Sequence, residues 1–229
     1  MIVKDETVRV LRDFCGINDS IVIYPGDVIR SRNDDGDILA EYKPGVVFHE
    51  VISIYDLARF LNSMKILGPD PEMVVNGDMI MLSSNGQNIQ YGMSPEDTMI
   101  KMDQSIEPFE PMVQFTIKNE DLRKIRQAAA ALGVQHLSIT QGEGDMIVRV
   151  HQLATESSNP TDDYYDFEIG PVLNGDGSKC EFVFDINSLP TFEGDYTVSL
   201  SNGVVSMFKN NFIDLTYWVA MREETKIGD

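Results

Sequence analysis

A run of nine residues near the N-terminus recurs, in altered form, at the middle of the chain. It begins at Lys4 as Lys-Asp-Glu-Thr-Val-Arg-Val-Leu-Arg and returns at Lys118 as Lys-Asn-Glu-Asp-Leu-Arg-Lys-Ile-Arg, in a chain of 229 residues. The lysine, the glutamate and both arginines are identical, and the fifth and eighth positions stay apolar. The second copy starts half a chain length after the first. We therefore expect two similar domains of about 110 residues each, a common domain size.

Both copies have the periodicity of an amphipathic helix. At 3.6 residues per turn, one face is expected to be buried: Val8, Leu11, Phe14 and Cys15 in the first copy, and Leu122, Ile125, Ala129 and Leu132 in the second. The opposite face carries two arginines in each copy: Arg9 with Arg12, and Arg123 with Arg126. Each half of the chain is therefore predicted to begin with a helix that exposes a pair of arginines.

The distribution of charge makes these arginines informative. The chain has 18 Lys and Arg against 37 Asp and Glu, a formal charge of -19, so at long range it should be repelled by nucleic acid and by anionic membranes. Three helix-like segments, 4–15, 53–67 and 118–132, nevertheless hold 9 of the 18 basic residues and only 6 of the 37 acidic ones. These basic residues are Lys4, Arg9, Arg12, Arg59, Lys65, Lys118, Arg123, Lys124 and Arg126. The helices are locally positive, and the remainder is strongly negative.

Between the helices, β-branched and aromatic runs alternate with turn residues, which is typical of antiparallel meanders and hairpins. In the first half we expect strands at 17–24, 27–32, 38–42, 46–52, 72–75, 79–83 and 87–91, and a helix over 53–67 with Ser53 as its N-cap. In the second half we expect strands at 115–117, 136–140, 145–153, 164–169, 181–184, 196–200, 204–209 and 214–221, with a turn at 174–178. A second helix from Asp185 should be cut short by Pro190. The pattern predicts an α+β fold.

The stretch 93–112 has a different character. Its prolines and intervening acids indicate an extended connector, so the predicted domains are 1–92 and 113–229, joined by 93–112. Phe109 and Met112 are apolar residues on this connector. Either they pack back onto the domains or they contribute to a docking site for a peptide.

No pattern of residues predicts catalysis, a metal site or a cofactor. His49, His136 and His151 lie far apart without zinc spacing, and the carboxylates of residues 34–37 lack the spacing of a calcium loop. Phosphate-binding loops, serine elbows and HExxH motifs are missing as well. Cys15 and Cys180 are expected to be reduced, in a soluble intracellular protein without a signal peptide or membrane span. This favours a binding or scaffolding protein over an enzyme.

Particular residues resemble a known family. The run from Lys4 through Phe14 to Asn18, together with Ile54-Tyr55-Asp56-Leu57 and Phe60-Leu61, is similar to the sliding clamp, the DNA polymerase processivity factor, of T4-type bacteriophages. The resemblance covers nearly the whole chain and is best in the first 70 residues. It implies a DNA clamp fold of two similar domains, each with an antiparallel sheet outside and helices lining a central hole. Three chains would close head to tail into a ring around duplex DNA.

The same resemblance implies roles for particular residues. The residues that would face DNA are Lys4, Arg9, Arg12, Arg59, Lys118, Arg123, Lys124 and Arg126. A pocket for partner peptides would involve Phe109, Met112, Trp218 and Met221, with a place in the core as the alternative for Trp218. The implied partners are duplex DNA, the phage DNA polymerase, an ATP-driven clamp loader and late-transcription factors, all in the cytoplasm of the infected bacterial host. No catalytic residue, metal or cofactor is implied.

Two alternatives from other classes remain. An acidic protein can mimic DNA and occupy a DNA-binding enzyme, which would require carboxylates in a regular surface row and no positive face. A hydrolase that uses only carboxylates is the second alternative, because so acidic a chain always offers pairs of them.

Overall fold

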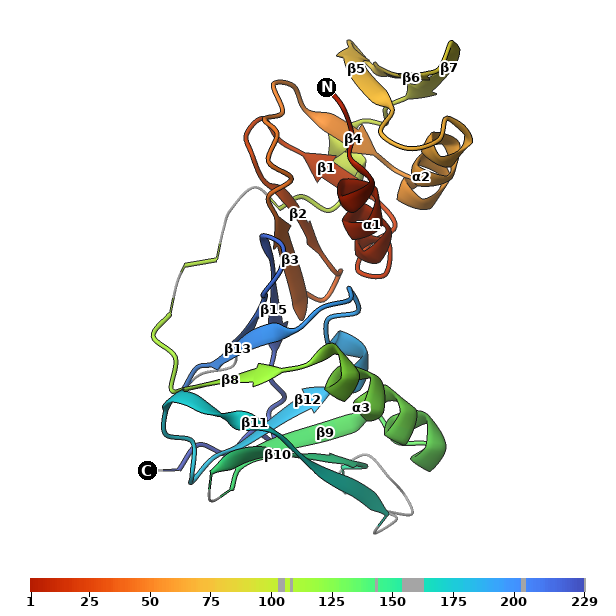
Figure 1. Ribbon diagram of the computed structural model, residues 1–229. Coiled ribbons are helices and arrows are strands. Elements are labelled where there is room, and N and C mark those ends of the chain that lie inside the picture. Colours follow the sequence, from red (N-terminus) through yellow and green to blue (C-terminus); the bar gives the residue numbers. More distant parts are fainter. Residues whose placement is uncertain (103–105, 108, 143, 154–162, 203–204, 229) are drawn as a thin grey trace. The chain divides into compact units, whose positions relative to one another are not determined.

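In the computed structural model, the described residues are 1–102, 106–107, 109–142, 144–153, 163–202 and 205–228. The chain divides into two compact units, Met1–Ile106 and Glu107–Asp229 (Figure 1). Each unit contains its own strands and at least one α-helix, and each is described by itself below.

The first unit contains two α-helices and three small antiparallel strand groups. Its elements are α1 (Asp5–Phe14), β1 (Ile21–Ile23), β2 (Ile29–Arg32), β3 (Ile38–Tyr42), β4 (Ile52–Ile54), α2 (Leu57–Ile66), β5 (Glu72–Asn76), β6 (Met79–Ser84), β7 (Gln87–Gly92) and the 3₁₀ turn η1 (Glu96–Thr98). Strand β1 pairs with β4, β2 pairs with β3, and β5, β6 and β7 form a meander. Helices α1 and α2 lie side by side (Figure 1).

The second unit is built on a long antiparallel sheet. Its elements are β8 (Val113–Ile117), α3 (Asn119–Leu132), β9 (His136–Gln141), β10 (Asp145–His151), β11 (Tyr164–Gly175), β12 (Glu181–Asp185), the 3₁₀ turn η2 (Ile186–Ser188), β13 (Tyr196–Leu200), β14 (Val205–Asn210) and β15 (Leu215–Ala220). Within the unit the strand order is β12-β9-β10-β11-β8-β13-β14-β15. Helix α3 packs against β10, β11 and η2 (Figure 1). The predicted α+β class is confirmed.

The predicted helices form, but their buried faces differ slightly from the prediction. Helix α1 buries Thr7, Val10, Leu11 and Phe14, whereas Val8 and Cys15 are only half-buried. The buried side of α1 faces Tyr42 of β3, whose hydroxyl lies 3.5 Å from the Thr7 hydroxyl and donates a hydrogen bond to Glu6 at 2.7 Å. Helix α3 buries Leu122, Ile125 and Ala129 as expected, but Leu132 in its last turn is exposed.

The second helix begins later than predicted. Asp56, not Ser53, is the N-cap of α2: its carboxylate accepts a hydrogen bond from the Arg59 backbone amide at 2.8 Å. Ser53 lies within β4, where its hydroxyl donates to the Ser94 carbonyl at 2.6 Å. The strand predicted at 46–52 is also wrong for most of its length, since β4 starts only at Ile52.

In the second unit, one prediction about a helix is confirmed and one about the end of a strand is wrong. The predicted helix from Asp185 is reduced to the 3₁₀ turn η2 before Pro190, so its expected shortness is confirmed. The predicted end of the strand at 169 is wrong, because β11 runs on to Gly175. It continues by changing its partner from β10 to β8, with a register shift between Val172 and Asn174.

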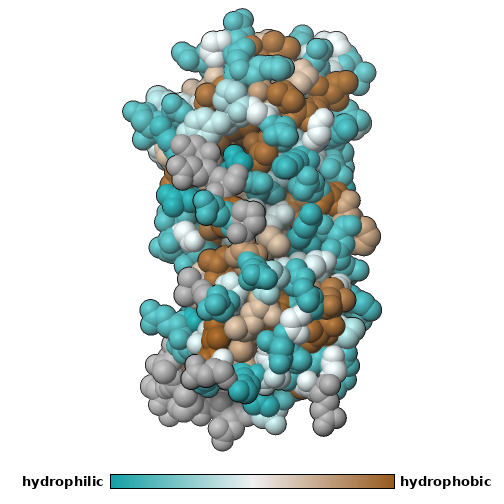
Figure 2. Space-filling model, turned by 90° about the vertical axis from the view of Figure 1, so that its left-hand side faces the viewer, coloured by the Kyte–Doolittle hydropathy of each residue, from teal (hydrophilic) through white to brown (hydrophobic). Residues whose placement is uncertain are grey.

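The face of the molecule shown in Figure 2 is mostly hydrophilic, with hydrophobic residues in separate patches. Within the described ranges, none of the helices is long and apolar enough to cross a membrane.

Replacing Tyr42 with Phe tests the contact between α1 and β3. The Tyr42 hydroxyl is held by Glu6 and Thr7, so its loss should lower the free energy of unfolding by about 1 kcal/mol in urea denaturation at neutral pH. Burial raises the pKa of Tyr42 to about 12, with Glu6 adding to the shift, while a tyrosine in the unfolded chain ionises near 10.

The pH dependence gives a second test of the same residue. A raised native pKa means that the contribution of Tyr42 to stability is complete below about pH 10 and is lost as the pH rises toward 12. The Phe variant should lack this part of the alkaline decline. A decline identical in both proteins would contradict the assignment.

Candidate functional site

Helix α1 presents three exposed cations. Lys4 is its N-cap residue, and Arg9 and Arg12 follow on the outer face. The Arg9 guanidinium lies 3.5 Å from the Asp5 carboxylate, one turn earlier in the helix. Arg12 donates to the side-chain oxygen of Asn62 on α2 at 3.4 Å. The predicted exposure of both arginines on α1 is thus observed.

The neighbouring helix α2 adds Arg59 and Lys65, both exposed. A groove of about 550 Å³ is lined by α1, α2 and the loop that follows α2. Its lining includes Arg9, Arg12 and Lys65 together with the carboxylates of Asp5 and Asp70. The first unit therefore has a surface on which cations from two helices gather, with two carboxylates among them.

In the second unit, α3 carries the equivalent residues. Lys118 is its exposed N-cap residue, and Arg123 is also exposed. Lys124 is half-buried, 3.4 Å from Glu120 and 3.7 Å from Asp121, with its ammonium 5.9 Å from the centre of the Phe167 ring. Partial desolvation lowers the pKa of Lys124, but the two carboxylates more than offset this, so the pKa lies above its ordinary value.

Arg126 has a different environment from the other predicted cations. Its guanidinium donates to the backbone carbonyls of Leu122 at 3.4 Å, Leu189 at 3.3 Å and Pro190 at 2.5 Å. These carbonyls belong to α3 and to the segment directly after η2. Arg126 is therefore positioned to hold η2 against α3, in the half where the second helix is reduced to a single turn.

The four residues predicted to bind partner peptides lie in the second unit. Phe109 and Met112 are half-buried, and Met112 packs back onto the sheet: its amide donates to Leu200 at 2.8 Å and its sulfur lies 3.5 Å from Cys180. Trp218 and Met221 are 7% and 6% exposed. A partner could therefore reach only the edges of Trp218 and Met221 in this conformation.

A polar network on the sheet of the second unit was not foreseen. The Ser138 hydroxyl lies 2.8 Å from His151 Nε2 and donates to Glu181 at 3.0 Å, while Lys226 binds the other oxygen of Glu181 at 2.7 Å. The hydrogen bond from Lys226 lowers the pKa of Glu181 despite partial burial. In a nucleophilic triad the histidine stands between the serine and the acid, but here the serine stands between them. Pairing across β9, β10 and β12 creates this network, and sequence spacing gives no signal for it.

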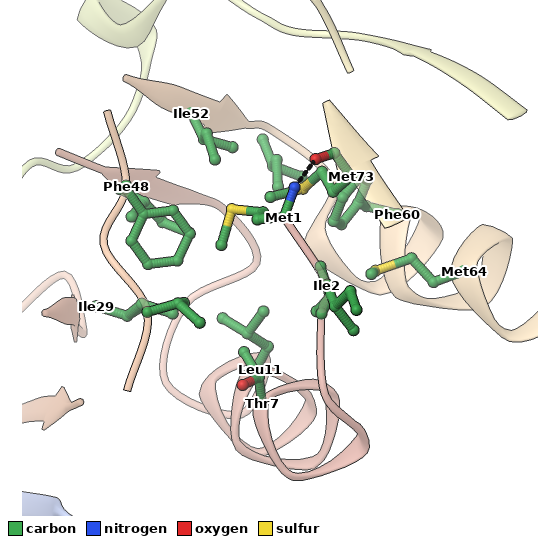
Figure 3. A pocket seen from close by; sticks show the side chains of 14 residues that line it. Met1, Ile2, Thr7, Leu11, Ile29, Phe48, Ile52, Phe60, Met64 and Met73 are labelled. Atoms are coloured by element: carbon green, nitrogen blue, oxygen red, sulfur yellow. Dashed lines mark hydrogen bonds between the residues drawn. The ribbon is translucent and has the colours of Figure 1, made fainter. Parts of the chain in front are cut away.

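An apolar cavity in the first unit was also not foreseen. It has a volume of about 20 Å³ and is lined by side chains that include Leu11, Phe48, Phe60 and Met73 (Figure 3). The N-terminal residues close it: the Met1 amino group donates to the Met73 carbonyl at 2.7 Å, the dashed line in Figure 3. The cavity offers room for about one water and almost no polar lining, so it is a packing defect of the core.

Two units of helices packed on antiparallel sheets, with exposed cations on the helices of an acidic chain, have the architecture of the DNA clamp fold. The comparison with solved structures agrees on the fold. The A. fulgidus PCNA bound to the C-terminal region of FEN-1 matches with a TM-score of 0.73 at 13% identity, over 98% of each chain. The proliferating cellular nuclear antigen of Entamoeba histolytica matches with a TM-score of 0.66 at 14% identity, over 94% of each chain.

The sequence comparisons point to bacteriophage clamps. Residues 114–223 match the family model of the gp45 sliding clamp, C-terminal. The sliding clamp of Vibrio phage KVP40 is 22% identical over 223 residues, 96% of this chain and 98% of that protein. Those of Escherichia phage RB69 and Enterobacteria phage T4 are 23% identical over 230 residues and 25% over 203, covering 98% and 87% of each chain. The predicted resemblance is confirmed: over nearly its whole length the chain is similar to the sliding clamps of T4-type phages, and residues 114–223 match the gp45 sliding clamp, C-terminal family model.

The contacts of Arg126 generate a prediction about stability. Changing Arg126 to Met removes charged hydrogen bonds to carbonyls of three residues and should lower the free energy of unfolding by about 2 kcal/mol, measured by urea denaturation. The matched change, Arg123→Met, removes an exposed cation on the same helix and should alter stability by no more than about 0.5 kcal/mol. Equal effects of the two changes would show that Arg126 does not hold η2.

Proposed function

We propose that the chain is a sliding clamp that encircles duplex DNA as a ring and tethers the replicative DNA polymerase, without catalysing a reaction itself. The observation that carries this proposal is the segregation of charge on a clamp fold. In a chain of formal charge -19, cations gather on the helices: Lys4, Arg9, Arg12, Arg59, Lys65, Lys118 and Arg123 are exposed on α1, α2 and α3 or at their N-caps. The exposed cations elsewhere, such as Lys43, Arg149 and Lys209, are dispersed over loops and strands.

Such a distribution suits a contact that does not depend on DNA sequence. Duplex DNA carries one negative charge per about 1.7 Å of its axis, and cations that meet its phosphates position the protein without reading bases. The acidic remainder of the chain would repel DNA from every other surface. The ring would therefore be held on DNA by its topology, and its contacts could remain weak.

Ring closure requires two sheet edges that can pair, and β7 and β11 offer such edges. In the first unit, β5 is covered by N-terminal residues through the Ile2–Glu72 bridge, which leaves β7 as the edge. In the second unit, the C-terminal segment covers β12 through the Glu181–Lys226 bridge. Between Tyr164 and Glu168, β11 pairs with β10 on one side, and among the described residues no strand lies on the other.

We therefore propose that β7 of one chain pairs with β11 of the next. The Met93 amide donates to Asp78 at 2.8 Å, so in the alternating antiparallel ladder the Gln90 amide points away from β6. Such an edge is free to pair with another chain. The contact joins two different edges, so repetition of it gives a closed ring or an open filament. Three copies would form the ring.

The polymerase, a clamp loader and late-transcription factors are the partners we propose, acting in the cytoplasm of the infected host. Their peptides would bind near Phe109, Met112, Trp218 and Met221. What supports this site is the half-burial of Phe109 and Met112, since a partly exposed apolar residue can contact a partner.

We also propose the division into domains 1–92 and 113–229, with the connector 93–112 between them. The boundary between the two compact units, at Ile106, lies inside that connector.

The alternatives have less support. A DNA mimic would need a surface without a positive face, whereas the helices of both units expose cations. A carboxylate hydrolase would need an acid and a base held together. Such a site would not explain why the helices of both units expose cations.

Charge reversal on α1 and α3 tests the proposal. The variant Arg9→Glu with Arg123→Glu replaces two exposed cations per chain by acids, which should weaken binding to duplex DNA by more than about tenfold at low salt. Primer extension on a long template, with the cognate polymerase and clamp loader, should fall to the length made without a clamp. Assembly should be unchanged, because neither residue lies on β7 or β11.

The matched control reverses the same charge elsewhere. Lys43→Glu with Lys209→Glu alters two exposed lysines outside the helices and gives the same net charge. Extension length should stay close to that of the unaltered protein. The proposal fails if both double variants support long extension equally well, or if both lose it equally.

A further inference from the structure

We infer that Asp5 and Glu120 compete with DNA for the cations of α1 and α3, and thereby keep the contact between the clamp and DNA weak enough for sliding. This inference rests on the proposed function and assigns a role to two acids within its DNA-facing surface. It follows from four observations: the geometry of each pair, its exposure, the capping of each helix, and the contact of Arg12 with a neutral side chain.

On α1, the acid lies one turn before the cation that it contacts. The Asp5 carboxylate is 3.5 Å from the Arg9 guanidinium, and the two side chains are 71% and 50% exposed. Asp5 also lines the groove formed by α1, α2 and the loop that follows α2, beside Arg9 and Arg12. A phosphate that approaches Arg9 from solvent therefore meets the carboxylate in the same place.

On α3, the same spacing recurs with different residues. The Glu120 carboxylate lies 3.4 Å from the Lys124 ammonium, again four positions away, and the glutamate side chain is 75% exposed. In the sequence repeat, however, Glu120 corresponds to Glu6 and Lys124 to Val10. The two halves therefore reach the same arrangement, an exposed acid one turn before an exposed or half-exposed cation, at different positions of the repeat.

Neither acid is the one that caps its helix. The Asp5 backbone amide at the start of α1 donates to Asp70 at 3.1 Å, so the capping carboxylate there comes from a different segment. At the start of α3, the Lys118 amide donates to the Asp121 carboxylate at 3.1 Å. Asp5 and Glu120 do favour the helix dipole, as any acid in a first turn does. Capping itself does not require them, and both side chains are free to act on the neighbouring cation.

Exposed pairs of this kind are weak, and weakness is what competition requires. A solvent-exposed ion pair contributes little to stability, so a DNA phosphate can displace the carboxylate from Arg9 or Lys124. The displaced carboxylate then remains within a few ångströms of the phosphate and repels it. Each acid therefore weakens the binding of DNA in two ways: it competes with the phosphate for the cation, and its negative charge repels the phosphate.

Arg12 provides the contrast within the same groove. Its side chain contacts the neutral oxygen of Asn62 at 3.4 Å, which does not repel a phosphate. The clamp surface thus combines at least one cation beside a neutral acceptor with cations that carry their own acids. The balance between the two kinds would set the affinity for DNA.

Neutralising the two acids tests the inference. The variant Asp5→Asn with Glu120→Gln keeps the size of both side chains and removes two negative charges per chain. The probe is a short, fluorescently labelled linear duplex of mixed sequence, onto which a ring can thread from the ends, and binding is followed by anisotropy from about 50 to 200 mM salt. Across six sites in a trimer, small gains at each site should together tighten binding about tenfold at low salt.

The control removes equal charge from a different surface. Glu50→Gln with Asp214→Asn changes two exposed acids outside the three helices, one shortly before β4 and one between β14 and β15. It should tighten binding by less than about twofold, through net charge alone. The charge-preserving variant Asp5→Glu with Glu120→Asp should bind like the unaltered protein. Circular dichroism before each titration ensures that folded proteins are compared.

The outcomes separate this inference from the proposed function. Tightening confined to Asp5→Asn with Glu120→Gln supports it, whereas unchanged affinity, or the same change in the control, overturns it. In that case the proposed function stands, provided that Arg9→Glu with Arg123→Glu still weakens binding in the same assay. If that variant also has no effect, the proposed function itself has failed.

Discussion

The burial of one face of α1 and α3 against their sheets determines which side chains the rest of the molecule can use. Val10, Leu11 and Phe14 in α1 are at most 4% exposed, as are Leu122 and Ile125 in α3. Because these faces are buried, Arg9, Arg12 and Arg123 on the opposite faces are exposed to solvent. The helices need the sheet for stability, because isolated helices of 10 and 14 residues are marginal in water. The cationic surface is therefore a consequence of core packing.

The sequence alone predicts the parts that depend on local periodicity and turn chemistry. The hairpins β5, β6 and β7 lie where Asn76-Gly77 and Asn85-Gly86 place them, and Asn85 and Gly86 both have positive φ, as a tight hairpin turn requires. The sequence also predicts the exposure of Arg9, Arg12 and Arg59. The prediction fails where contacts with a distant segment determine the local structure. Ser53 donates a hydrogen bond to Ser94 instead of capping α2, and the length of β11 depends on pairing with a second strand, β8.

The two halves are similar but not equivalent, and Arg126 shows how the difference is accommodated. The first unit has a full second helix, α2, whereas the second unit has only the turn η2. Arg126 donates to one carbonyl within α3 and to two carbonyls directly after η2, and so connects the turn to the helix. Helical periodicity places Arg126 on the same face as Arg123. It gives no sign of the two carbonyls after η2 that contact Arg126, because they belong to a segment more than 60 residues away. A repeat in sequence therefore predicts shared elements more reliably than shared roles.

The central claim is that three chains close into a ring through β7 and β11, and sedimentation equilibrium tests it most directly. Over a range of protein concentrations without DNA, the account predicts a species of three times 25.7 kDa. Gln90→Pro, which removes the amide that β7 directs outward, should shift the mass toward 25.7 kDa, whereas Gln90→Thr should not. A single species of 25.7 kDa at every concentration, in the unaltered protein, would contradict the account.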